Sequence, residues 1–424
     1  MKFIYKLLSL SLAIACLSGC SAANTEIASS SAATATVTPT TDSTEVPASN
    51  NVFTSAGDGL YVTTDSGIYE LQTVFPDSAN IFYTDANTKE RIFLCANPNC
   101  THADESCPSY IATPSAMFPP MLLRVGDQLL VVFTEATDSS NPHGMLMNMD
   151  GSNRRTVFEL ASNQYMQGGF CTSGNDLYFD LYEINDSGNV TYQLWYVSFE
   201  NGTSEKVMDL GSDSDHYSLC DGANNELCFN HVSSDGISYC MYNPQSKTIS
   251  DPFFVDSSVS GNSMIQDGYL FVLDEQASSV QRIRLSDEEQ ASASFTVKEG
   301  FGAPSMRYLF DGNLMITEAQ TTASDIPTDG SYGGCSYILD FGTRNCTEFT
   351  LQTPYNNRPV YVLTTIGDAC YVATDYKTYT PTSVSEDGTV SNFDYVANIY
   401  AFITKQDYIN SNQNGYSMVK DAFE

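Results

Sequence analysis

The residues with the clearest chemical potential in this sequence are three cysteines and one histidine between positions 95 and 107. Their spacing is Cys95-x4-Cys100-x-His102-x4-Cys107. Thiolates and a neutral imidazole are ligands that zinc prefers, so these four side chains could complete a tetrahedral site. The spacing differs from the common zinc-finger spacings, and the single residue between Cys100 and His102 makes a tight chelate.

Oxidation is the competing fate of the same cysteines. In an oxidising compartment Cys100 could pair with either Cys95 or Cys107 and so pin a loop that lacks secondary structure. We favour this disulfide over zinc. The N-terminal export signature implies an oxidising compartment, and the ligand spacing is compatible with zinc without being typical of a zinc site. If neither forms, His102 is an ordinary polar loop residue.

Seven further cysteines follow, most of them inside strand-like sequence: Cys171, Cys220, Cys228, Cys240, Cys335, Cys346 and Cys370. Cysteines in strands are more often small buried apolar residues than bridges. Connectivity cannot be deduced from sequence alone, so we expect at most one further disulfide. Cys335 with Cys346 is the first candidate, because the two fall on the predicted third and fourth strands of one repeat unit.

Carboxylates alternate in the segment Ser212-Asp213-Ser214-Asp215-His216. Such a loop could hold calcium, but it lacks the glycine and the distal glutamate of a calcium-binding hand loop. We favour a solvated loop. Zinc and calcium are thus the two ions for which the sequence offers candidate ligands.

A search for catalytic sets finds no specific motif. Gly-x-Ser-x-Gly, His-Glu-x-x-His and phosphate-binding glycine loops are all missing from the sequence. Four histidines leave few candidates for a general base. The nearest approach to a sialidase Asp-box, residues 63–69, lacks the closing residues and is predicted to be a hairpin turn. We therefore expect no catalytic residue and no resident organic cofactor.

The N-terminal segment carries an export signature. Residues 1–19 contain Lys2 and Lys6, followed by an apolar run from Leu7 to Leu17 that is too short to cross a bilayer. The run ends in Leu17-Ser18-Gly19-Cys20, which resembles the lipobox of bacterial lipoproteins. That resemblance implies cleavage before Cys20 and lipid on its thiol; the alternative is an ordinary signal peptide with a chance cysteine. No other stretch is apolar for long enough to span a membrane, so we expect the lipid to be the only membrane attachment.

Residues 20–51 are rich in Ser, Thr and Ala and have almost no large apolar side chain. Such a composition cannot bury enough surface to offset the conformational entropy of folding, so we expect a disordered tether. A flexible chain of this length spans on the order of 30 Å, which keeps the folded part near its membrane.

The charge balance is strongly acidic, with 51 Asp and Glu against 18 Lys and Arg. A surface of this sign repels phosphate backbones, so nucleic acid is excluded as an expected partner. Cations, basic peptides and neutral sugars remain compatible with it.

Residues 52–424 repeat one unit seven times, a Gly or Asp turn followed by an apolar strand. Between the anchor positions 60, 129, 177, 227, 270, 314 and 370 lie intervals of 69, 48, 50, 43, 44 and 56 residues. Periods of roughly 40–50 residues with strand signals alone are typical of a β-propeller. We predict an all-β fold of seven four-stranded blades, with six as the alternative if the long first or last interval is misread.

The second unit shows the four predicted strands most plainly, at 121–125, 128–134, 144–148 and 155–160. The only helical turn that we expect lies at 405–412. We also expect the strand at 52–55 and the last strand at 416–420 to join the first and last blades, because closing the ring removes an exposed sheet edge. Closure of that kind places the tether beside the final blade.

The segment from Leu94 to Cys107 also carries a family resemblance. It resembles the Leu-Cys-x(2)-Pro-x-Cys-x-His-x(4)-Cys segment that follows the first blade in uncharacterised Gram-positive lipoproteins, whose propeller is likened to that of the low-density-lipoprotein receptor. The resemblance implies a propeller fold and an extracytoplasmic, lipid-anchored location, and it implies no reaction. We therefore expect a binding or scaffolding module for an envelope protein or carbohydrate, with a polysaccharide hydrolase or lyase as the alternative.

Overall fold

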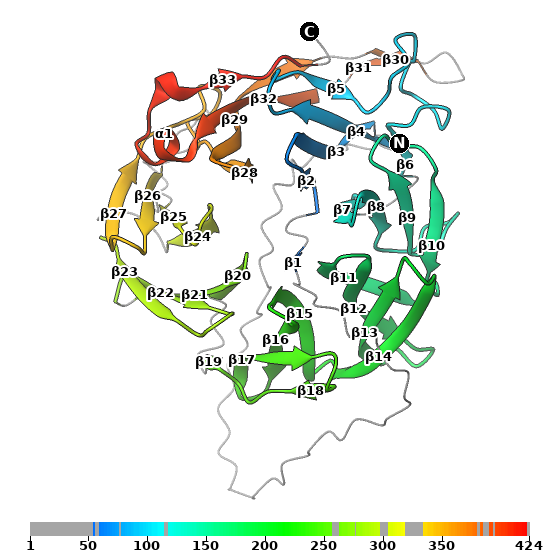
Figure 1. Cartoon of the computed structure of the whole chain (residues 1–424), viewed down its shortest axis with the longest axis vertical. Coiled ribbons are helices and arrows are strands. Elements are labelled where there is room, and N and C mark those ends of the chain that lie inside the picture. The colour runs from blue at the N-terminus through cyan, green and yellow to red at the C-terminus, as the bar shows by residue number, and fades with distance from the viewer. Residues whose placement is uncertain are drawn as a thin grey trace, which may run out of the picture.

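The computed structural model describes residues 54–55, 59–75, 78–113, 118–256, 263–275, 277–296, 304–318, 334–379, 382–384, 390–392 and 395–421. Antiparallel sheet dominates these ranges (Figure 1). The helix α1 (Lys405–Ile409) lies within the predicted helical turn at 405–412, and the short 3-10 turn η1 (Gln413–Gly415), which we did not predict, follows it. Neither they nor any other described segment forms a helix that could cross a membrane.

Seven blades of antiparallel strands follow one another around a ring and form a seven-bladed β-propeller (Figure 1). Blades 3 and 4 are joined into one ten-stranded sheet, because their strands β14 and β15 pair with each other. Blade 1 contains β2 (Tyr61–Thr63), β3 (Gly67–Phe75), β4 (Ser78–Asp85), β5 (Arg91–Phe93) and β6 (Tyr110–Ala112). Blade 2 contains β7 (Met121–Val125), β8 (Gln128–Phe133), β9 (His143–Asn148) and β10 (Arg155–Glu159). Blade 3 contains β11 (Gln164–Ser173), β12 (Asp176–Ile184), β13 (Val190–Ser198) and β14 (Thr203–Ser212).

The remaining blades follow the same order. Blade 4 contains β15 (Asp215–Ala223), β16 (Glu226–Ser233), β17 (Gly236–Asn243), β18 (Thr248–Ile249) and β19 (Phe254–Asp256). Blade 5 contains β20 (Ser263–Gln266), β21 (Tyr269–Asp274), β22 (Ser279–Arg284) and β23 (Gln290–Ser294), and blade 6 contains β24 (Ser305–Tyr308), β25 (Leu314–Glu318), β26 (Cys335–Asp340) and β27 (Asn345–Phe349). Blade 7 contains β28 (Val362–Ile366), β29 (Ala369–Tyr379), β32 (Tyr395–Thr404) and β33 (Ser417–Met418), with the small hairpin β30 (Thr382–Val384) and β31 (Val390–Asn392) between β29 and β32.

Seven blades are confirmed, and six are excluded. The four strands predicted for the second unit match β7 to β10 within one residue at each end. The turn between β7 and β8 uses Gly126 at φ 54°, a left-handed conformation that glycine adopts without steric cost. The first interval between repeat anchors is long because its anchor, Leu60, precedes the first strand of blade 1. The other six anchors lie on the second strand of their blades.

The N-terminal strand does not pair where we predicted. β1 (Thr54–Ser55) is antiparallel to β11 of blade 3, with Thr54 opposite Thr172, and has no place in the last blade. β11 is the first strand of its blade and lies toward the middle of the ring (Figure 1). An inner strand leaves an edge of unpaired backbone groups, and β1 uses that edge.

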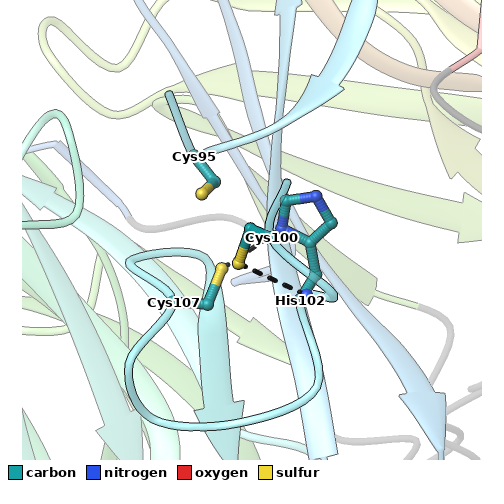
Figure 2. A group of neighbouring side chains, drawn as sticks. All are labelled: Cys95, Cys100, His102 and Cys107. Atoms are coloured by element: carbon teal, nitrogen blue, oxygen red, sulfur yellow. Dashed lines mark hydrogen bonds between the residues drawn. The ribbon is translucent and has the colours of Figure 1, made fainter. Parts of the chain in front are cut away.

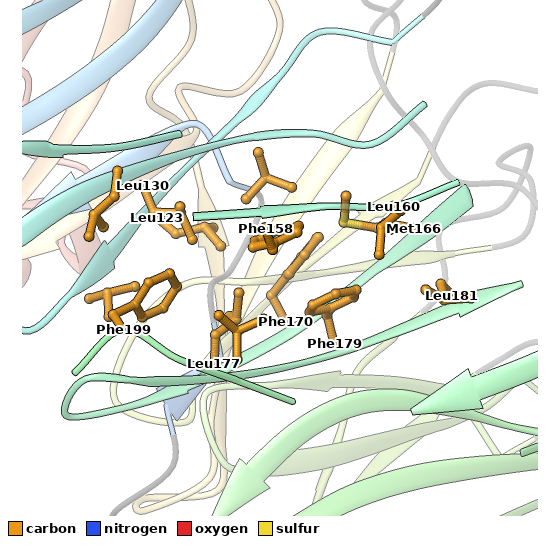
Figure 3. Packing of buried hydrophobic residues seen from close by; sticks show 14 residues of the cluster. Leu123, Leu130, Phe158, Leu160, Met166, Phe170, Leu177, Phe179, Leu181 and Phe199 are labelled. Atoms are coloured by element: carbon orange, nitrogen blue, oxygen red, sulfur yellow. The ribbon is translucent and has the colours of Figure 1, made fainter. Parts of the chain in front are cut away.

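The apolar core of the described residues is divided among seven clusters, one between each pair of neighbouring blades. Figure 3 shows the cluster between blades 2 and 3, where Leu130 and Phe158 meet Leu177 and Phe179. Each such side chain contributes about 1.5–3 kcal/mol when it is fully buried. Every blade therefore depends on a neighbour on both sides.

The junction between blades 7 and 1 has the smallest cluster and a buried ion pair beside it. Arg91 is 1% exposed; its Nη2 lies 2.9 Å from Glu70 Oε2 and its Nη1 donates to Asp421 Oδ1 at 3.1 Å. Tyr400, from β32 of blade 7, donates to Glu70 Oε1 at 2.5 Å. The chain near Lys420 also runs parallel to β5, as Arg91 N donates to the Lys420 carbonyl at 2.8 Å. The C-terminal half of the predicted ring closure is therefore present.

We expect Glu70→Gln to destabilise the protein by about 3 kcal/mol, because it leaves the buried Arg91 guanidinium without its main counter-charge. The matched control is Glu90→Gln at the same junction, whose exposed pair with Lys420 contributes less than about 1 kcal/mol. Urea unfolding measures both. If the two variants lost equal free energy of unfolding, ring closure would not depend on the buried ion pair.

Two buried carboxylates join further blades. Asp180 of β12 is 1% exposed and accepts the Leu219 backbone N–H of blade 4 at 3.1 Å. Burial raises the pKa of Asp180 to about 7, and the Leu219 hydrogen bond only partly opposes this. Asp221 of β15 likewise accepts the Gly268 N–H of blade 5 at 2.9 Å, and burial raises its pKa to about 6. In both cases the hydrogen bond between blades offsets part of the free-energy cost of burying a carboxyl group.

The Asp180 carboxyl group makes stability depend on pH. Between pH of about 4 and about 7 the folded protein holds a proton that the unfolded chain has lost, so stability falls as pH rises through this window. We expect Asp180→Asn to reduce that fall to the part that Asp221 causes below pH of about 6. The variant should also raise stability at pH 8 by a few kcal/mol, at about 1.4 kcal/mol for each pKa unit. Chemical denaturation from pH 4 to 8 tests this, with the exposed Asp235→Asn as control. If Asp180→Asn lost the same amount of stability at every pH, the Asp180 carboxyl group would not be the cause of the pH dependence.

Candidate metal centre

The cysteine and histidine segment is an insertion in the outer strand of blade 1. β5 and β6 both pair with β4, β5 along one half and β6 along the other. Both ends of the insertion are hydrogen-bonded to Ile81 of β4. Leu94 N donates to the Ile81 carbonyl at 2.9 Å, and Ile81 N donates to the Ser109 carbonyl at 2.8 Å. Of residues 94–109, only Cys107 and Ser109 are buried. The loop therefore has almost no apolar core of its own.

The four predicted ligands come together in this loop (Figure 2). Their ligand atoms, three sulfurs and one imidazole nitrogen, all lie within 4.8 Å of one another. His102 Nδ1 faces the Cys107 sulfur at 3.2 Å. They form the one such group of metal-binding side chains that the described part of the chain contains.

Neighbouring side chains hold two of the four ligands, His102 and Cys107, in place. Asn80 of β4 donates through Nδ2 to the His102 carbonyl at 3.1 Å and to Ser109 Oγ at 3.0 Å. Ser109 Oγ in turn lies 3.1 Å from the Cys107 sulfur. The imidazole of His102 stacks on Phe93, with ring centroids 4.0 Å apart. Outer contacts of this kind fix the orientation of metal ligands.

The backbone at His102 is held in an unusual conformation. Its φ is 56°, in the left-handed region, which costs a residue other than glycine on the order of 1 kcal/mol. This conformation accompanies a backbone hydrogen bond from His102 N to the Cys100 sulfur at 3.4 Å. Such strain persists only where the surroundings require it, which makes the position a candidate functional site.

Within this group of ligands the pKa values of Cys95 and Cys107 are shifted in opposite directions. Burial raises the pKa of Cys95, to about 11. Burial also acts to raise the pKa of Cys107, but the hydrogen bonds from Ser109 and His102 outweigh it and lower the value to about 6. Cys107 thus has the character of a thiolate near neutral pH.

The Cys335–Cys346 disulfide that we predicted does not fit the observed register. The two residues lie on β26 and β27 as expected, but Cys346 is opposite Leu339 and Cys335 is opposite Glu318 of β25. Four positions along β26 separate Leu339 from Cys335, too far for a bond that needs Cα atoms within roughly 7 Å. Instead, the Cys335 thiol donates to Glu318 Oε2 at 3.3 Å. Cys171, Cys228, Cys240 and Cys370 are buried, as expected for small apolar residues in strands.

The acidic segment 212–216 forms the tight hairpin between β14 and β15. Asp215 Oδ1 lies 2.6 Å from His231 Nε2 across the sheet, and His216 stacks on Tyr192. In the described residues no group of three or more His, Cys, Asp or Glu side chains forms at this segment. The lipidation candidate Cys20 and the expected domains 1–19 and 20–51 lie outside the described residues.

Sequence reasoning missed a cavity of about 450 Å³ at the junction of blades 7, 1 and 2. Its walls are the ends of the inner strands β2, β7 and β28 with their turns, together with the β4–β5 turn, and the lining residues are Thr63, Thr64, Asp65, Ala86, Lys89, Arg124, Thr365, Ile366, Gly367 and Ala369. The polar part of the lining consists of three threonines, one carboxylate and two cations, and the rest is apolar. No sequence motif marks the cavity, because three blades contribute to it.

The lining of the cavity is relevant to the alternative prediction of a polysaccharide hydrolase or lyase. A glycoside hydrolase usually needs two carboxylates about 5–9 Å apart. Among the residues that the structure describes, Asp65 is the one carboxylate that lines this cavity. Among the same residues, Glu70 is the one carboxylate that lines the second cavity, and Arg91 and Tyr400 engage it.

Comparison with known proteins finds matches in structure alone. No family model matches the chain, and no curated protein matches its sequence. The chain is similar to the tricorn protease, with a TM-score of 0.31 and 10% identity over 81% of this chain, but it spans only 35% of that protein's length. It is also similar to oligogalacturonate lyase from Vibrio parahaemolyticus, with a TM-score of 0.39 and 10% identity over 82% of this chain and 91% of the other. A third similar structure is TolB from Acinetobacter baumannii, with a TM-score of 0.32 and 10% identity over 82% and 80% of the two chains. At these identities and scores no activity or ligand can be transferred, and the chain itself is a β-propeller.

Proposed function

We propose that this protein is a lipid-anchored extracytoplasmic lipoprotein whose propeller binds an envelope ligand. In this proposal lipid on Cys20 holds the protein to the cell membrane, and residues 20–51 serve as the tether between the lipid and the propeller. The lipobox-like residues before Cys20 support the anchor. The acidic composition, which repels nucleic acid and anionic lipid, supports a partner in the envelope instead.

The observation that carries the binding role is the cavity between blades 7, 1 and 2. Its volume of about 450 Å³ lies within the range of roughly 300–1,000 Å³ that small-molecule sites occupy. Rigid inner strands form its walls, and Thr63 Oγ1 and Thr364 Oγ1 lie 3.0 Å apart where blades 1 and 7 meet beside it. A site on such strands is already formed before a ligand arrives.

The lining indicates what the ligand would be. The hydroxyls of Thr63 and Thr64 already hydrogen-bond within the protein, to Thr364 and to the Gly67 backbone. A hydroxyl both donates and accepts, so the capacity that remains, together with the Thr365 hydroxyl, suits a polyhydroxylated ligand such as a sugar. Arg124 adds a guanidinium whose side chain is 43% exposed and which suits a carboxylate. Lys89 is already held over the Phe402 ring at 3.9 Å. We therefore propose a saccharide that carries a carboxyl group, and soluble peptidoglycan fragments are a suitable probe.

We expect such fragments to bind the full-length protein in titration calorimetry. Arg124→Ala should weaken binding by about tenfold or more, because a hydrogen bond to a charged group contributes about 1.5–3 kcal/mol. Thr365→Trp should abolish it by filling the cavity.

The matched control is Arg284→Ala in blade 5. Arg284 and Arg124 each pair with an aspartate three residues further on, and both are partly exposed. Binding that is equally sensitive to both arginine variants, or insensitive to Thr365→Trp, would place the ligand elsewhere and refute the cavity as the site.

A further inference from the structure

We propose that Cys95, Cys100, His102 and Cys107 hold a structural zinc ion that fastens the insertion of blade 1 to the propeller. This site is separate from the cavity described above and does not depend on a ligand there. The sequence favours a disulfide for these cysteines, whereas the arrangement of the side chains points to the metal.

The first argument is the distance between donor atoms. With Zn–S bonds of about 2.3 Å, ligands at the corners of a tetrahedron lie roughly 3.8 Å apart. All four ligand atoms here lie within 4.8 Å of one another, and His102 Nδ1 is 3.2 Å from the Cys107 sulfur. The four atoms therefore need to move little to surround one ion.

The second argument is the number of donors that converge. A disulfide joins two sulfurs at about 2.05 Å and would leave the third cysteine and the imidazole without a role. In this loop the imidazole is also turned inward, by its stacking on Phe93 and by the left-handed backbone at His102. Zinc accounts for all four side chains at once, since thiolate and imidazole are its preferred ligands.

The third argument is the charge. Three thiolates and Zn²⁺ leave one net negative charge, and each thiol that binds gives its proton to solvent. The guanidinium of Arg154, at the β9–β10 turn of blade 2, lies nearby; its Nη1 donates to the Tyr110 carbonyl at 2.6 Å and its Nη2 to that of Pro108. Arg154 also interacts electrostatically with Cys107. It can therefore balance that charge while it joins blade 2 to the insertion.

Four protein ligands leave no open position on the metal, which is typical of structural rather than catalytic zinc. The loop buries little apolar surface, so metal binding can supply the folding energy that a core would otherwise provide. Zinc would then stabilise the insertion in the outer strand of blade 1, where apolar packing is lacking.

The test begins with the unaltered protein. Full-length chain is purified without chelator, its zinc is measured by elemental analysis, and peptide mapping records the state of its cysteines. We expect about one zinc per chain, with all three thiols protected from alkylation until a chelator is added. Bound zinc together with cysteines that are reduced but react with the alkylating reagent only after chelation supports the proposal. A metal-free protein whose map shows Cys100 joined to Cys95 or Cys107 overturns it, and so does a reduced metal-free protein that fails to take up one equivalent of zinc.

Variants then assign the ligands. Cys100→Ser and His102→Asn should lose zinc, and the cobalt-substituted protein should lose the visible absorption of a tetrahedral cobalt–thiolate site. Cys346→Ser is the matched control, because this cysteine is exposed and lies in blade 6, away from the loop. Retention of zinc by both ligand variants, or its loss from the control alone, would contradict the assignment. The measurements on the unaltered protein decide the question even if a variant fails to fold.

Discussion

Closure of the ring is the constraint on which the rest of the structure depends. Each blade buries its two faces against its neighbours, and the seven apolar clusters lie one to a junction. A ring left open would expose two such faces to water. The junction of blades 7 and 1 has the smallest cluster, and there Glu70, Arg91 and Tyr400 supplement apolar packing with buried polar contacts. These contacts have directional geometry, so they can fix how the last blade meets the first.

The same junction creates the candidate binding site. The cavity takes its walls from blades 7, 1 and 2, so it exists only once the chain has closed on itself. Residues more than 300 positions apart in the sequence, such as Thr63 and Thr364, are neighbours there. Binding at this cavity would therefore report the closed state of the propeller.

The insertion in blade 1 shows a different way of making a stable structure. Elsewhere the strands pack through apolar side chains, but residues 94–109 leave the sheet at Ile81 and return to it there. Their order comes from polar contacts around the four candidate metal ligands. These contacts involve Ser109 of the segment itself, Asn80 of the neighbouring strand β4 and Arg154 of blade 2. Function-bearing residues often lie on such loops because the rigid sheet beneath positions them.

The sequence by itself determined the all-β class, the seven repeats, the strands of blade 2 and the short helix, because alternating apolar residues and glycine turns are local signals. It also identified the four side chains of the candidate metal centre from their spacing. Only the tertiary structure decided the pairing of β1 with β11, the register that separates Cys335 from Cys346, and the contacts of Glu70, Asp180 and Arg124. These depend on which blades become neighbours, and on a register that a shift of one residue would change, so no local pattern encodes them.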